Sequence, residues 1–173
     1  MKGWLLARKS QIDHDFLRWT EEGVWVSKSG WVEVAAFLKA SSKYFMDMNI
    51  LKSRQYSAMD FSELSLPYDR IIFCEGFHGQ QNPLWSCLPF LPAKGELMEI
   101  RSSQPSQEYI LNKNGFVVPL GNQHFKVGAT YGWKEYSNKI TPEAFQELQQ
   151  KLAAMGCDEF ELVKQKTGIR PAT

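Results

Sequence analysis

The fold prediction starts from the stretch Arg70-Ile71-Ile72-Phe73-Cys74-Glu75-Gly76. Four apolar residues are followed directly by a glutamate and a glycine, which predicts a short strand buried on both faces that ends in a tight turn. Because glycine has no Cβ, a flat or charged ligand can approach the backbone at such a turn. A core strand that simply turns at Gly76 is the alternative.

Composition bounds the class of protein. The chain has 173 residues, of which 43% are apolar and 13% aromatic, enough for one domain with a real core. Its net charge is +1 without clustered Lys or Arg, which argues against binding to nucleic acid or a membrane surface. No apolar run approaches the length of a transmembrane helix, and residues 4–7 are too short for a signal-peptide core. Three scattered cysteines favour reduced thiols in a cytoplasmic protein.

Apolar spacing and turn residues predict the elements. Residues 4–7 read as a strand and residues 13–22 as a short helix, although composition does not decide either. Asn114-Gly115 and Gly121-Asn122 indicate hairpins, so antiparallel strands dominate the second half. Thr141 is the expected N-cap of a helix that ends at Gly156. The remaining expected elements are a helix over 31–45, with its aromatics in the core, and strands over 24–26, 96–101, 109–112, 116–119, 124–130 and 160–163.

Six short motifs follow one another in a fixed order. They are IIFCEG (71–76), NP (82–83), LPFLPAKGE (88–96), VPLG (118–121), KVGATYGW (126–133) and TGIRP (167–171). In this order they resemble flavoproteins of the D-amino-acid oxidase and glycine oxidase superfamily, and more narrowly a bacterial branch of FAD-dependent oxidoreductases. The resemblance covers residues 25–171. With the hairpins, it implies an α+β fold: a mainly antiparallel β-sheet with helices packed on one face, like the substrate domain of D-amino-acid oxidase-type flavoproteins.

The pyrophosphate-binding turn of that superfamily is missing from the sequence. No G-x-G pair occurs, so neither G-x-G-x-x-G nor a P-loop can be placed. We therefore expect residues 1–173 to be a single domain, an internal fragment of a longer flavoprotein that lacks the N-terminal GxGxxG unit and the C-terminal FAD segment. Its partners would be a small-molecule substrate and the missing FAD-binding part of the same chain. The isolated chain is expected to be inactive and to hold FAD weakly.

Motifs of other chemistries are poor. His14, His78 and His124 have no carboxylate or cysteine at a metal-binding spacing, so no metal site is predicted. Cys74 and His78 lack a third orienting group, which favours a buried core thiol over a nucleophile.

The resemblance assigns roles to a few residues. Arg170 matches the arginine that clamps a substrate carboxylate with its planar fork, while a surface ion pair is the alternative. A flavin needs few acid or base groups from the protein, so no catalytic side chain is named. The residues expected to face the flavin are Gly76, Gly95, Gly168 and Ile169.

One position departs from the superfamily. Phe116 stands where D-amino-acid oxidase has a carboxylate-binding tyrosine, so Tyr131 or Trp133 would line the substrate pocket instead, with core packing as the alternative for each. The implied reaction is oxidation of an amine next to a carboxylate, as in amino-acid or N-methyl amino-acid oxidases and dehydrogenases. A non-catalytic binding or interaction domain derived from a flavoprotein sheet is the competing function.

Overall fold

The computed structural model of the protein describes residues 15–21, 23–55, 57, 68–133 and 137–172. The chain divides into two compact units, residues 1–51 and residues 52–173. No helix among the described residues is both long and apolar enough to cross a membrane. The strand considered for residues 4–7 lies outside the described residues.

The first unit contains a small hairpin, in which β1 (Leu17–Trp19) pairs antiparallel with β2 (Val24–Val26). The strand predicted over 24–26 is confirmed, whereas the helix considered for residues 13–22 is wrong, because β1 occupies its middle. The hairpin closes through Thr20, whose N donates to the Gly23 carbonyl at 2.9 Å and whose Oγ1 accepts from Gly23 N at 3.2 Å. These turn bonds hold the chain extended on both sides.

Helix α2 (Val34–Asp47) follows, close to the predicted 31–45. The Glu33 side chain caps it by accepting from Ala35 N at 3.3 Å. None of its residues is buried, and Phe37 and Tyr44 are both exposed. The expectation that its aromatics pack in a core is therefore wrong for the described structure. Apolar residues at helical spacing produce the helix, but that spacing does not say which surface covers its apolar face.

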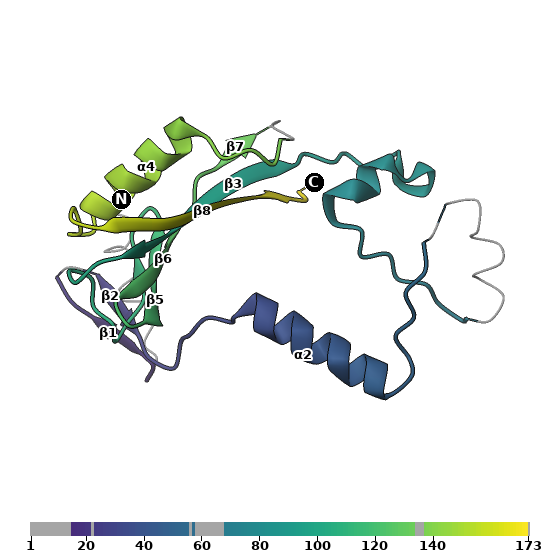
Figure 1. The fold of residues 1–173 in the computed structure, drawn as a ribbon, viewed down its shortest axis with the longest axis horizontal. Coiled ribbons are helices and arrows are strands. Elements are labelled where there is room, and N and C mark those ends of the chain that lie inside the picture. The colour runs from purple at the N-terminus through teal and green to yellow at the C-terminus, as the bar shows by residue number, and fades with distance from the viewer. Residues whose placement is uncertain (1–14, 22, 56, 58–67, 134–136, 173) are drawn as a thin grey trace. The chain divides into compact units, whose positions relative to one another are not determined.

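The second unit is built around β3 (Ala93–Arg101), the central strand of an antiparallel sheet (Figure 1). Along one edge β3 pairs with β6 (His124–Gly128) and β7 (Gly132–Trp133), and β8 (Glu161–Arg170) also pairs with it. Beyond β6 lie β5 (Phe116–Gly121) and β4 (Leu111–Asn112). Every pairing is antiparallel, which confirms the fold class.

The stretch quoted first does not form the predicted strand. Residues 70–75 have no regular secondary structure, the Ile72 side chain is 85% exposed and Cys74 is exposed. An apolar run becomes a strand only when a neighbour bonds its backbone, and in the described sheet β3 is paired with β6, β7 and β8 instead. The turn at Gly76 is present, with φ +60°, and it opens the 3₁₀ helices η2 (Gly76–Gln81) and η3 (Pro83–Trp85).

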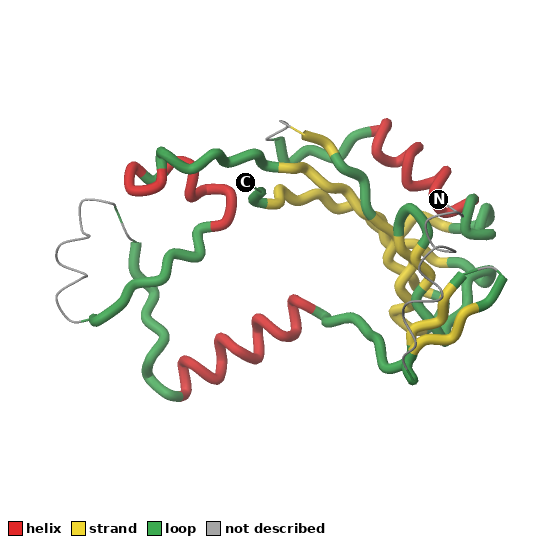
Figure 2. The backbone as a smooth tube through the Cα atoms, turned by 180° about the vertical axis from the view of Figure 1, so that it is seen from behind, coloured by secondary structure: helices red, strands yellow, loops and turns green. Residues whose placement is uncertain are grey.

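Helix α4 (Pro142–Ala153) covers one face of this sheet (Figures 1 and 2). Thr141 is its N-cap, accepting from Ala144 N at 3.2 Å, and Gly156 beyond its end has φ +86°, as predicted. Leu148 and Leu152 are fully buried against the sheet. The core they share consists of Met98, Ile100, Val117, Phe125, Val127, Leu148, Leu152 and Cys157.

Two local predictions need adjustment. The β5–β6 turn lies one residue later than expected, because Asn122 and Gln123 both have positive φ and form the two-residue loop. The last strand is longer than the predicted 160–163, since β8 continues through Thr167 to Arg170. Gly168 therefore belongs to a strand rather than to a loop.

Candidate functional site

The two faces of the sheet have different compositions. Residues directly paired across antiparallel strands point to the same face, and successive residues alternate between faces. Met98 pairs with Val127, and both belong to the core beside α4. Ala93, Gly95 and Leu97 have the opposite parity on β3, so they point away from α4. We call this second surface the site face.

The site face begins with a floor of small residues. Ala93 pairs with both Arg170 and Trp133, and Gly95 pairs with Gly168. Arg170 and Trp133 therefore stand beside Ala93, at the edge of a floor made by the two glycines. A Cβ built on Gly168 meets no atom within 4 Å, whereas one on Gly95 comes 3.3 Å from the Thr130 carbonyl oxygen. The backbone is thus open to a ligand above Gly168.

This floor borders a pocket of about 270 Å³. Five of the predicted site residues line it together: Gly95, Gly168, Ile169, Arg170 and Tyr131. The other lining residues are Ala93, Lys94, Ala129 and Thr130. Three segments far apart in sequence meet here because β3 pairs with β8 and because residue 130 bonds β3. The pocket is small, of a size that holds part of a drug-sized ligand.

Arg170 and Tyr131 are joined directly. Arg170 Nη1 donates to Tyr131 Oη at 2.5 Å, so within the described part of the chain this side chain bonds a hydroxyl rather than a carboxylate. The Tyr131 and Trp133 rings lie 6.3 Å apart between centroids and are tilted by 42°. Both residues are 57% exposed, so neither packs in the core, and of the two only Tyr131 lines the pocket.

Three predicted residues lie outside the pocket lining: Trp133, Phe116 and Gly76. Phe116 pairs with Gly128, which pairs with Leu97, so it is on the site face but further along the sheet. Its ring lies over Gly128, where a Cβ would come 2.6 Å from Phe116 Cζ. Gly76 opens η2 and does not line the pocket, so its role toward a flavin stays a prediction.

No family model matches the chain. Part of the chain shares the fold of a glycine oxidase. The glycine oxidase from Geobacillus kaustophilus superposes with a TM-score of 0.50 and 23% sequence identity, over 58% of this chain and 29% of that protein. A glycine oxidase from Bacillus cereus gives a TM-score of 0.39 and 21% identity, over 46% of this chain and 23% of that one. The matched region is therefore less than a third of the Geobacillus protein.

Sequence reasoning missed a buried ion pair beside this pocket. Lys94 Nζ lies 3.2 Å from Glu96 Oε1, and the two side chains are only 3% and 2% exposed. The Glu96 carboxylate also accepts from Thr141 N, Thr141 Oγ1 and Gln165 Nε2, at 3.1, 2.9 and 2.9 Å. The sequence contains a signal for this pair, because a lysine and a glutamate two residues apart on a strand point to the same face of the sheet.

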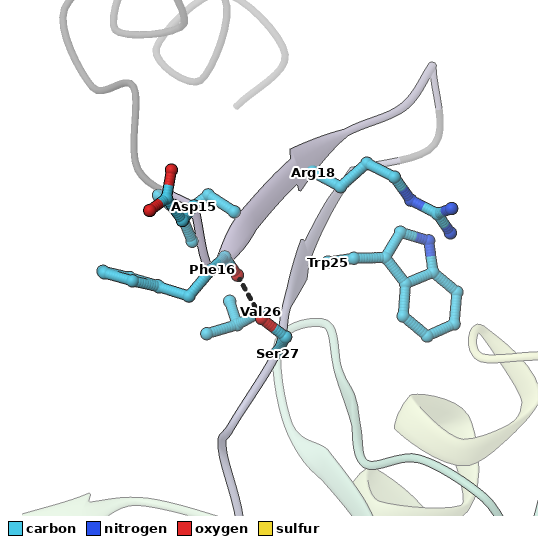
Figure 3. A pocket seen from close by; sticks show the side chains of 7 residues that line it. Asp15, Phe16, Arg18, Trp25, Val26 and Ser27 are labelled. Atoms are coloured by element: carbon cyan, nitrogen blue, oxygen red, sulfur yellow. Dashed lines mark hydrogen bonds between the residues drawn. The ribbon is translucent and has the colours of Figure 1, made fainter.

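A second hollow lies on the β1–β2 hairpin of the first unit (Figure 3). It measures about 310 Å³, and Ser27 Oγ donates to the Phe16 carbonyl at 3.1 Å beside it. The guanidinium carbon of Arg18 lies 5.9 Å from the centre of the Trp25 ring, so this cation is already engaged by an aromatic face. This hollow is therefore a weaker candidate binding site than the pocket beside Arg170.

Proposed function

We propose that this chain is the substrate-binding part of an FAD-dependent oxidoreductase that oxidises an amine next to a carboxylate. The observation that carries the proposal is that Arg170 borders the same pocket as the open glycine floor. The similarity of fold to glycine oxidases supports it. Because the match spans a minor part of those proteins, the activity is proposed for a longer protein that also contains an FAD-binding part.

Arg170 would receive the substrate carboxylate. Its guanidinium has five N–H donors, and Tyr131 Oη accepts from one nitrogen, so two parallel bonds to a carboxylate remain geometrically feasible. Holding the carboxylate fixes the neighbouring C–N bond over the floor, and this orientation supplies much of the rate. Tyr131 stands where it can share the anion with Arg170, compensating for the phenylalanine at position 116.

The residues of the floor fit a flat ring. Glycine at 168 leaves the backbone unobstructed, because nothing stands within 4 Å of its Cβ position, whereas the Thr130 carbonyl oxygen lies 3.3 Å from the Cβ position of Gly95. Gly95 and Gly168 would lie against the flavin, which supplies the two-electron oxidation when it is bound. Ile169 pairs with Lys94 and so has the opposite parity, and only its backbone would face the flavin.

The free cysteines, of which Cys74 and Cys87 are exposed and Cys157 is buried, support a cytoplasmic location.

Titration of the chain with acetate, a small carboxylate probe, tests the assignment of Arg170. Arg170→Leu should weaken acetate binding at least ten-fold, and Arg170→Lys, which keeps the charge but loses the fork, should give an intermediate loss. Lys164→Leu is the matched control, because it removes an exposed cation from the same strand. An acetate Kd that is equal in wild type and Arg170→Leu would refute the proposal.

An interaction domain is the second candidate. The exposed apolar residues of α2, among them Phe37 and Leu38, favour it, since large exposed apolar surfaces mark contact sites. The same surface would also suit contact with an FAD-binding part. An interaction domain requires the α2 surface and not Arg170, so Phe37→Glu would abolish its association while Arg170→Leu would leave it intact.

A further inference from the structure

The segment that leads from β6 to Tyr131 is held at two points. At the first, Lys151 Nζ of α4 donates to the Ala129 carbonyl at 2.8 Å. Lys151 is itself fixed, since Nζ lies 2.7 Å from Glu147 Oε1 one turn earlier on the helix. This contact ties the backbone just after β6 to the helix on the core side of the sheet.

The second point is Thr130, whose side chain is buried with the residue only 7% exposed. Its Oγ1 accepts from Glu96 N at 3.0 Å, and its own N donates to the Glu96 carbonyl at 3.1 Å. Glu96 is immobilised in turn by the buried pair with Lys94 and by its bonds to Thr141. Residue 130 is thereby clamped to β3 next to Gly95.

Tyr131 follows this clamp directly, and on its other side Gly132 of β7 pairs with Lys94 of β3. Its ring is mostly exposed, and its neighbour Trp133 is exposed to the same extent. We propose that Thr130 is a positioning residue, which holds the Tyr131 hydroxyl on Arg170 Nη1 and so fixes the orientation of the guanidinium over the floor. The consequence for carboxylate binding rests on the function proposed above, but the positioning of Arg170 does not.

Nuclear magnetic resonance of the Arg170 guanidinium tests the positioning without any ligand. In wild type, the bond to Tyr131 should restrict rotation of the Nη groups and give resolved Nη proton signals. Thr130→Val is isosteric but lacks the hydroxyl that accepts from Glu96 N, and it should average these signals. Tyr131→Phe, which removes the hydroxyl bonded to Arg170, should average them as well. Thr130→Ser, which restores the hydroxyl, should recover them. Glu99→Gln is the control, because Glu99 pairs with Lys166 of the same β8 strand.

The acetate titration supplies the second readout. Thr130→Val should raise the acetate Kd about three- to ten-fold, the loss expected for one hydrogen bond, and adding Tyr131→Phe should raise it no further. Unchanged Arg170 signals and acetate Kd in Thr130→Val, with only reduced stability, would overturn the proposal. A third outcome separates the two proposals. If neither wild type nor any variant binds acetate, but the Arg170 Nη signals are still averaged in Thr130→Val and recovered in Thr130→Ser, then Thr130 positions Arg170 and the proposed function fails.

A second variant covers the case in which Thr130→Val does not fold. Lys151→Met removes the other hold, at the Ala129 carbonyl, and Lys151 itself is not among the residues that line the pocket. It should broaden or average the Arg170 Nη signals in the same direction as Thr130→Val, while Glu147→Gln leaves the Ala129 contact in place and serves as its control. Wild-type Arg170 signals in a folded Lys151→Met protein would contradict the proposal.

Discussion

Glu96→Gln should destabilise the second unit by about 3 kcal/mol, at the lower end of the range for removing one partner of a buried ion pair. The substitution leaves the Lys94 ammonium, which is 3% exposed, without its carboxylate at 3.2 Å. It also replaces one oxygen that accepts from Thr141 or Gln165 by an amide nitrogen that cannot accept. Against a typical stability of about 5–15 kcal/mol, this is a large loss.

Hydrogen exchange of the Leu148 and Leu152 amides is the suitable assay, because both residues lie in the core of the second unit and report its unfolding separately from the first. Lys94→Met combined with Glu96→Gln should recover about 2 kcal/mol, since the buried cation is then gone as well. Glu99→Gln breaks a partly exposed pair and should lose less than about 1 kcal/mol. Wild-type exchange in Glu96→Gln, or strictly additive losses in the double variant, would refute the reasoning.

Three further predictions concern the sheet. Gly128→Ala should destabilise the second unit by about 1–3 kcal/mol in urea unfolding, because its Cβ would lie 2.6 Å from the Phe116 ring, and Phe116→Leu in the same chain should relieve this. Gly168→Ala has room for its Cβ, so it should unfold like wild type yet bind lumiflavin more weakly in a fluorescence titration, and unchanged lumiflavin binding would place the flavin elsewhere. The hydrogen bond from Lys166 lowers the pKa of Glu99, so its contribution to stability should be present above the usual carboxyl pKa and fade as pH falls through the lowered value. Glu99→Gln should flatten that acid-side dependence, and an unaltered pH profile would count against the pair.

Local chemistry predicted much of the second unit. The cap at Thr141 and the glycine at 156 bound α4 as expected, since both depend on interactions within a few residues. Asn-rich turns placed the hairpin of β5 and β6 to within one residue. Arg170, Tyr131 and Gly168 were named from sequence motifs, and the structure brings them to one pocket.

The sequence-based predictions that failed share a physical cause: each concerned a feature that depends on residues far away in the sequence. Residues 71–74 carry a buried-strand pattern, yet no strand of the described sheet pairs with them. The apolar face of α2 predicted the helix and not its exposure. The Lys94–Glu96 pair was missed because burial of a charge depends on α4 and β8, which supply the bonds that make it tolerable.

The most direct test of the central claim is anaerobic flavin reduction in a protein that joins these residues to an FAD-binding part. A panel of amino and N-methyl amino acids should reduce the flavin, and Arg170→Leu should slow the reduction by at least about 100-fold, the lower end of the loss expected for two charge-assisted hydrogen bonds. The rate of flavin reduction in Arg170→Lys should fall between those of wild type and Arg170→Leu, and the rate in Lys164→Leu should match wild type. Equal reduction rates in wild type and Arg170→Leu would remove Arg170 from the active site and contradict the account.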